Sequence, residues 1–105
     1  MKSITVQELK AKIDAKEDIQ VIDVREADEV EICNFGAEHI PMADLAHAVD
    51  RIRKDVPVII HCRSGKRSGN MIAFLEANHG LNNLYNLEGG ILAWAKEIDH
   101  QMPTY

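Results

Sequence analysis

Cys62 is the residue in this sequence whose neighbours are best suited to chemistry. Three basic side chains follow it within five positions, Arg63, Lys66 and Arg67, although the chain as a whole carries a net charge of −5. A free cysteine has a pKa near ~8.5, and basic neighbours or a helix N-terminus lower it to roughly 3.5–7.5. We therefore expect the Cys62 thiol to be largely ionised at neutral pH, as a nucleophile that attacks sulfur or phosphorus.

Small residues among the cations complete a loop that suits an anion. Gly65 allows a positive φ or a close approach of main-chain N–H groups. We expect Ser64 and Ser68 to donate hydrogen bonds to a bound sulfur; alternatively, Ser68 caps the helix that follows. Main-chain amides that converge at a helix N-terminus form an anion site without a formal charge. The loop is thus expected to hold an anionic substrate or a Cys62 persulfide.

A lone free cysteine is more often a small buried hydrophobic residue, so the elements around Cys62 decide its interpretation. Residues 57–62 include three consecutive β-branched side chains, typical of a strand buried on both faces of a parallel sheet. A helical pattern follows from about residue 68 to residue 78 and stops at Gly80. In such sheets ligands bind beyond the carboxyl ends of the strands. That is where the pattern places Cys62.

The rest of the chain alternates between short apolar runs and helical periodicity, without a linker, a repeat or a low-complexity tract. Further strands are predicted near residues 19–24 and 84–87, and helices near residues 6–15, 27–32, 43–54 and 91–98. Strands that alternate with helices over short connections predict an α/β fold, in which helices cover both faces of a parallel sheet. We expect one domain over residues 1–105.

Other polar groups have more ordinary expected roles. Asp23 and Arg25 end the neighbouring strand, and we expect a supporting polar network rather than catalysis. His61 directly precedes Cys62 in the strand, so its side chain points to the opposite face and is expected to be packed. The five histidines lack the close spacing of a zinc site, so no metal or cofactor is expected. Cys33 is expected to be a partly buried free thiol; the alternative is a disulfide that traps the persulfide.

Composition argues against several classes of protein. The excess of 17 Asp and Glu over 12 Lys and Arg, with a pI of about 5.4, argues against nucleic-acid binding. The longest apolar stretches span a few residues, whereas a membrane span needs about 20. The N-terminus lacks the apolar region of a secretory signal. We expect a cytoplasmic protein that binds neither membranes nor nucleic acids.

Three motifs carry a resemblance to a known family. The loop from Cys62 to Ser68 resembles the active-site loop of the rhodanese (thiosulfate sulfurtransferase-like) family. Residues 21–26, with His39-Ile40-Pro41, resemble the first signature of this family, and residues 87–94 resemble its C-terminal signature. The resemblance covers nearly the whole chain. It implies a five-stranded parallel sheet in which Ile4 and its neighbours add a short strand.

Loop length separates sulfur transfer from phosphate chemistry within this resemblance. Family members that transfer sulfur have a six-residue loop, whereas the related cell-cycle phosphatases have an arginine six positions after the cysteine. Here that position is Ser68, and Arg67 is the fifth. The resemblance implies that Cys62 takes a sulfane sulfur from a thiosulfate-like or persulfide donor, oriented by Arg63 with help from Lys66 and Arg67, and passes it to a nucleophile. Two alternatives stay open: a non-catalytic rhodanese-like binding module, and a cysteine phosphatase or arsenate reductase.

A finer resemblance concerns residues 31–34, 61–68, 83–92 and 98–105. These segments are similar to the C-terminal rhodanese domain of adenylyltransferase–sulfurtransferases, which serve molybdopterin or thiamine synthesis. The partners that this implies are a small anionic sulfur donor and a second protein, either a sulfur carrier or a cysteine desulfurase.

Overall fold

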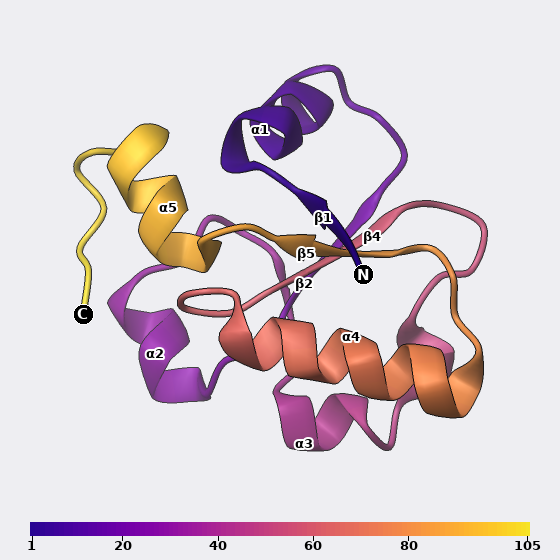
Figure 1. Cartoon of the computed structure of the whole chain (residues 1–105). Helices are drawn as coiled ribbons and strands as arrows, with labels where there is room; N and C mark the ends of the chain where they lie inside the picture. The colour runs from indigo at the N-terminus through magenta and orange to yellow at the C-terminus, as the bar shows by residue number, and fades with distance from the viewer.

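A five-stranded parallel sheet forms the centre of the protein, in a computed structural model that describes all 105 residues (Figure 1). Its strands are β1 (Lys2–Ile4), β2 (Gln20–Asp23), β3 (Glu38–His39), β4 (Val58–His61) and β5 (Leu84–Leu87). They lie in the order β1-β5-β4-β2-β3, and every pairing is parallel. The predicted α/β fold with a five-stranded parallel sheet is confirmed, and β4 is its central strand.

Helices cover both faces of this sheet. Helices α1 (Val6–Asp14) and α5 (Gly90–Glu97) pack on one face. Helix α3 (Met42–Leu45), the 3-10 helix η1 (Val49–Arg51) and helix α4 (Lys66–His79) pack on the other. Helix α2 (Ala27–Ile32) lies beside the loop that leads into α4 (Figure 1). None of the helices is both long and apolar enough to cross a membrane.

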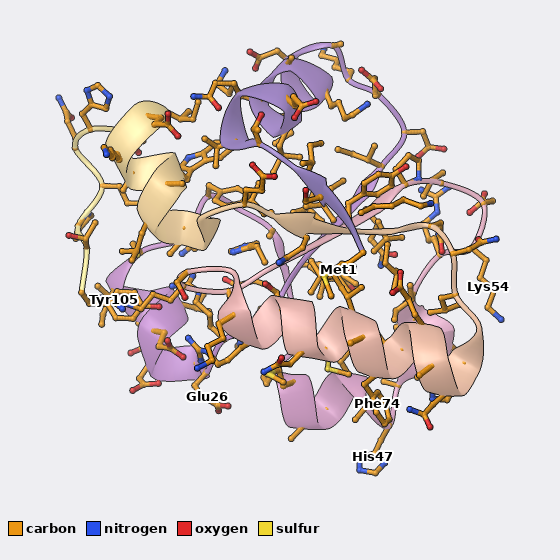
Figure 2. The ribbon with its side chains drawn as sticks, viewed as in Figure 1. Met1, Glu26, His47, Lys54, Phe74 and Tyr105 are labelled. Atoms are coloured by element: carbon orange, nitrogen blue, oxygen red, sulfur yellow. The ribbon has the colours of Figure 1, made fainter.

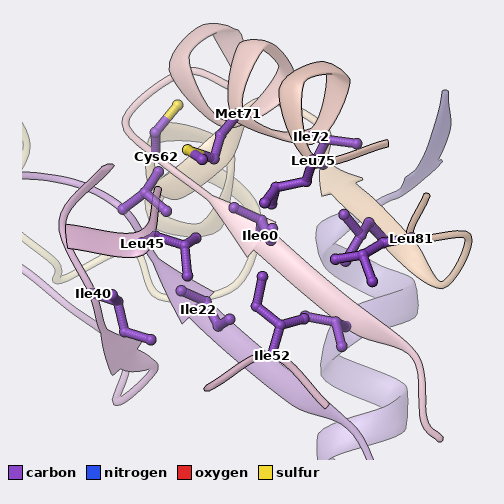
Figure 3. Close-up of a cluster of buried hydrophobic side chains, with 13 residues drawn as sticks. Ile22, Ile40, Leu45, Ile52, Ile60, Cys62, Met71, Ile72, Leu75 and Leu81 are labelled. Atoms are coloured by element: carbon purple, nitrogen blue, oxygen red, sulfur yellow. The ribbon is translucent and has the colours of Figure 1, made fainter. Parts of the chain in front are cut away.

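The apolar residues of β4 serve two separate cores, because successive side chains of a strand point to opposite faces. Val58 and Ile60 belong to a cluster of 13 buried residues with the side chains of α3 and α4, whereas Ile59 packs with Leu9 of α1 and Trp94 of α5. Figure 3 shows the larger cluster, with Cys62 at its edge and the Cys62 sulfur directed away from the isoleucines of the sheet. The burial of both faces thus positions the end of β4.

The prediction of one continuous helix over residues 43–54 is wrong. Two short pieces, α3 and η1, replace it, and Ala48 between them has φ −136° and ψ 41°, outside the helical region. The apolar stripe that suggested the helix is nevertheless buried, since Leu45 and Ile52 are 0% and 2% exposed. In a short segment the packing of such side chains against the sheet outweighs the preference for a continuous helix.

Helix α4 begins two residues earlier than predicted. Its first residue is Lys66, and Gly65 is its N-cap in the left-handed region, with φ 101°. Ser68 therefore lies in the first turn of the helix and is not its cap, so this alternative for Ser68 is wrong. The early start turns the N–H groups of the first turn toward Cys62.

Candidate active site

The sulfur of Cys62 lies inside a loop whose hydrogen-bond donors converge on it. Cys62 directly follows β4, and the loop runs from there to the start of α4. The main-chain N–H of Gly65 donates to Sγ at 3.1 Å, and the main-chain N–H of Ser68 does so at 3.4 Å. The Ser68 hydroxyl lies 3.3 Å from the same sulfur. This arrangement stabilises a negative charge on Sγ without a formal positive charge.

These donors determine the ionisation state of Cys62. Burial raises the pKa of the thiol, because it removes the charged form from water. Hydrogen bonds from the Ser68 hydroxyl and from the main-chain N–H groups of Ser68, Gly65 and Ser64 favour the thiolate, and together they outweigh the effect of burial. The pKa of Cys62 is therefore below its ordinary value.

Removing the Ser68 hydroxyl tests this account. In Ser68→Ala the thiolate keeps its main-chain donors and loses one hydrogen bond, and such a bond to a charged group contributes about 1.5–3 kcal/mol. Since one pKa unit corresponds to about 1.4 kcal/mol, we expect the pKa of Cys62 to rise by roughly one to two units. The measurement is the pH dependence of Cys62 alkylation by iodoacetamide, whose midpoint moves to higher pH.

Asn70→Ala is the matched control for Ser68→Ala. Asn70 is an exposed polar residue of the same helix. Its replacement is expected to leave the alkylation midpoint where it is in the parent protein. An unchanged midpoint in Ser68→Ala as well would mean that the main-chain donors alone set the pKa.

The sulfur of Cys62 lies in a closely packed part of the protein. Cys62 is 1% exposed. The surface hollows of the protein lie elsewhere, and none is lined by a residue of the segment 62–67. The space on which the amides converge is filled by Sγ itself. Little of the Cys62 thiol is therefore exposed to a donor molecule in this structure.

The first turn of helix α5 is hydrogen-bonded to the main chain of the loop. The main-chain N–H groups of Ile91 and Leu92 donate to the carbonyl oxygens of Cys62 and Arg63 at 3.0 and 3.1 Å. These bonds direct the loop carbonyls toward α5, away from the sulfur. Gly90, at φ 56°, lies so close that a Cβ there would come within 2.5 Å of both carbonyl oxygens. Gly90, which entered the sequence analysis only as part of the C-terminal signature, thus allows α5 to pack closely against the loop after Cys62.

Asn86 of β5 contacts both the loop and the first turn of α4. Its amide Nδ2 donates to the carbonyl oxygen of Gly65 at 3.0 Å, and its Oδ1 lies 2.6 Å from the Ser68 hydroxyl. The single hydroxyl proton of Ser68 serves either Asn86 or Cys62. Sequence reasoning did not identify Asn86, although a polar residue inside the short, otherwise largely apolar strand β5 was a usable signal.

The three basic residues of the loop differ in their surroundings. Arg67 forms a two-pronged ion pair with Glu29 of α2 at 2.7 and 2.9 Å, and these hydrogen bonds lower the pKa of Glu29 to about 2. Arg63 donates to the main-chain oxygen of Tyr105. Lys66 is exposed to solvent. The charge of Arg67 is therefore balanced within the protein, whereas Lys66 is open to a ligand.

A family comparison places this site among known proteins. The family model of the rhodanese-like domain matches residues 5–97, a range that contains Cys62, the loop after it and all of α5.

The chain belongs to the rhodanese-like family.

Relatives of this rhodanese-like domain include proteins named as sulfurtransferases. The putative sulfurtransferase YtwF of Bacillus subtilis (strain 168) is 40% identical over 98 residues, which cover 92% of this chain and 93% of that protein. The crystal structure of a rhodanese-like domain protein from Staphylococcus aureus has a TM-score of 0.82 and 34% identity, and the match covers 100% of this chain and 99% of that one. Sequence and fold therefore agree on the family.

The resemblance to adenylyltransferase–sulfurtransferases is also confirmed. The probable adenylyltransferase/sulfurtransferase MoeZ of Mycobacterium tuberculosis (strain ATCC 25618 / H37Rv) is 30% identical over 106 residues. The match covers 98% of this chain but 27% of MoeZ. The rhodanese-like domain described here corresponds to that portion of the larger protein.

Asp23 and Arg25 form a buried ion pair beside the active-site loop of this rhodanese-like domain. The Arg25 guanidinium donates to the Asp23 carboxylate at 2.7 to 3.1 Å and to the main-chain oxygen of Cys33 at 2.8 Å. Burial raises the pKa of Asp23, but the hydrogen bonds from Arg25 outweigh it and the net pKa is lowered. These contacts join the end of β2 to the residues that follow α2.

His61 and Cys33 lie outside the hydrogen-bond network around the Cys62 sulfur. The His61 ring is fully buried, stacked on Phe35 at 4.7 Å between centroids, and its Nε2 has no hydrogen-bond partner. Burial lowers the pKa of His61, which keeps the ring neutral. Both cysteines are free thiols as predicted. Cys33, expected to be partly buried, is buried at 6% exposure.

Proposed function

We propose that this protein is a sulfurtransferase that moves a sulfane sulfur by way of a persulfide on Cys62. The thiolate Sγ attacks the outer sulfur of a thiosulfate-like donor. A new S–S bond forms, the S–S bond of the donor breaks, and the electron pair leaves with the sulfite. A nucleophilic acceptor then attacks the outer sulfur of the persulfide, and the electron pair of the broken bond returns to Cys62 as thiolate.

The convergence of main-chain N–H groups on one sulfur, with the Ser68 hydroxyl beside it, is the observation that carries this proposal. Gly65 and Ser68 place two main-chain N–H groups and one hydroxyl within 3.4 Å of Sγ. Such fixed dipoles stabilise the thiolate before the reaction and after it, and their orientation needs no rearrangement during the step. Relatives named as sulfurtransferases support the same assignment.

Sulfur transfer fits the loop better than phosphate chemistry. A phosphoryl group carries several oxygens that need donors, and a phosphatase of this fold uses an arginine six positions after its cysteine. Ser68 occupies that position here, and Arg67 pairs with Glu29.

We also propose which classes of donor and acceptor the site serves. Thiosulfate or another small anion suits the exposed Lys66 beside the loop. The portion of MoeZ that this chain matches favours a protein acceptor, such as the C-terminus of a sulfur carrier, or a protein donor such as a cysteine desulfurase.

A second candidate is a rhodanese-like binding module without catalytic activity. One observation favours it: Cys62 is 1% exposed, so little of its thiol is accessible to a donor. The two functions predict opposite results when the protein meets a sulfane sulfur donor, and one measurement separates them.

That measurement is the intact mass of the protein after incubation with thiosulfate. A sulfurtransferase is expected to gain the mass of one sulfur atom and to lose it on addition of cyanide, with release of thiocyanate. The control Cys33→Ser is expected to gain the same sulfur, because Cys33 lies outside the loop. A folded protein whose mass does not change is the binding module. Hydrolysis of p-nitrophenyl phosphate, without sulfur uptake, would point to the phosphatase instead.

A further inference from the structure

The C-terminal segment, residues 98–105, returns across the molecule and ends against the active-site loop. It leaves α5 through hydrogen bonds from the N–H groups of Ile98 and Asp99 to the carbonyl oxygen of Trp94, and Met102 packs on the smaller core. Figure 2 shows Tyr105 beside α2, next to the loop that precedes α4. The sequence pattern singles out this ending, and the proposed reaction makes no use of it.

Both the side-chain hydroxyl and the main-chain oxygen of Tyr105 are hydrogen-bonded within the protein. Its hydroxyl lies 3.0 Å from Arg25 Nη1, which donates to it, and it donates to the Glu29 carboxylate at 2.9 Å. Its main-chain oxygen accepts from Arg63 Nε at 2.6 Å and also from Arg63 Nη2. The Arg63 guanidinium lies 5.1 Å from the centroid of the Tyr105 ring, within the range of a cation–π contact.

These contacts occupy the part of Arg63 that an oxyanion would use. The Nε and Nη2 groups form one edge of the guanidinium, and such an edge binds the two oxygens of an anion in parallel. Both groups are taken by the main-chain oxygen of Tyr105, and the ring covers one face. Since Arg67 is paired with Glu29, two of the three cations of the loop have partners within the protein.

We propose that Tyr105 is a specificity-determining residue that withholds Arg63 from small anionic donors. Such a donor must displace the Tyr105 main-chain oxygen before it can use the arginine, which weakens its binding. A donor that does not need Arg63, such as a protein persulfide, bears no such penalty. This inference rests on the proposed function, because it assigns the substrate preference of the same site.

Alkylation of Cys62 tests the inference without any sulfur transfer. Iodoacetate is anionic and iodoacetamide is neutral, so the ratio of their rates at Cys62 reports how strongly the loop attracts an anion. In a Cys33→Ser background, removal of Tyr105 is expected to raise this ratio roughly three- to tenfold, as expected for one freed charge a few ångströms away. The same deletion in an Arg63→Gln protein is expected to change nothing.

Tyr105→Phe is a milder variant, which serves as a second test in case the deletion disturbs the fold of residues 98–105. It keeps the ring and the main chain but loses the hydrogen bonds to Arg25 and Glu29, so the expected rise in the ratio is smaller. In steady-state assays the deletion is expected to lower KM for thiosulfate by a similar factor and to leave kcat unchanged. A ratio that falls, or stays constant in both variants, overturns the inference. A raised ratio in a protein that takes up no sulfur would overturn only the proposed function.

Discussion

Replacing Cys62 by serine is expected to abolish sulfur transfer, with a loss of at least roughly a thousandfold in kcat/KM for thiosulfate, as for other catalytic nucleophiles. Serine keeps the size of the side chain and its place among the loop donors. Its hydroxyl, however, stays protonated in a site whose donors lower the pKa of a thiol, and it forms no persulfide. The measurements are thiocyanate formation with cyanide as acceptor and the intact mass after thiosulfate treatment.

Cys33→Ser is the matched control for this experiment, because it removes the other thiol of the chain. It is expected to retain the sulfur uptake and the rate of the parent protein. Both variants are expected to unfold cooperatively at temperatures close to that of the parent. Uptake of sulfur by Cys62→Ser, or its loss in Cys33→Ser, would assign the persulfide to Cys33 and contradict the role proposed for Cys62.

The parts of the fold that could be predicted are those with a strong local signal. The consecutive β-branched residues of β4 identify a buried central strand, and the predicted segments 27–32 and 84–87 coincide with α2 and β5. Strand β3 has only two residues, and it exists because Glu38 and His39 pair with the end of β2. No pattern within two residues encodes such a pairing.

The same distinction applies to the candidate site. Cys62, Gly65 and Ser68 lie close together in the sequence, where β4 gives way to α4, so their spacing alone predicts that donors converge on the sulfur. Asn86 and Tyr105 reach the loop from 18 and 42 positions away along the chain, and their contacts follow only from the finished packing. The near-complete burial of Cys62 has the same origin, because it results from elements that the loop sequence does not contain.

The long-range contacts also change how the basic residues are interpreted. From the sequence, Arg63, Lys66 and Arg67 are three charges available to an anion. In the structure, Arg67 is balanced by Glu29, and Arg63 is engaged by Tyr105. The main-chain and hydroxyl donors of the loop, rather than the cations, are the largest favourable contributions to the lowered pKa of Cys62. The positions of the hydrogen-bond donors, rather than nearby positive charges, therefore lower the pKa of Cys62.

The donors must be held in place around the sulfur, so the contact between the loop and α5 is a second site where one substitution has a large effect. Gly90→Ala is expected to lower the free energy of unfolding by roughly 2–5 kcal/mol. A left-handed conformation costs a residue with a Cβ about 1–2 kcal/mol, and overpacking against fixed neighbours adds about 1–3 kcal/mol. The new Cβ would meet the carbonyl oxygens of Cys62 and Arg63 at 2.5 Å, and main-chain atoms cannot turn aside as a flexible side chain does. Chemical denaturation measures the loss.

Gly80→Ala separates the two contributions. Gly80 also has a positive φ, 64°, but a Cβ there meets no atom within 4 Å. It is expected to lose only the conformational part, about 1–2 kcal/mol, and to leave the alkylation midpoint of Cys62 unchanged. Gly90→Ala is expected to raise that midpoint as well, because the loop must shift to admit the methyl group and its donors then move off the sulfur. Equal losses of stability in the two variants, with equal midpoints, would show that the carbonyls of Cys62 and Arg63 yield freely and that α5 does not hold the loop in place.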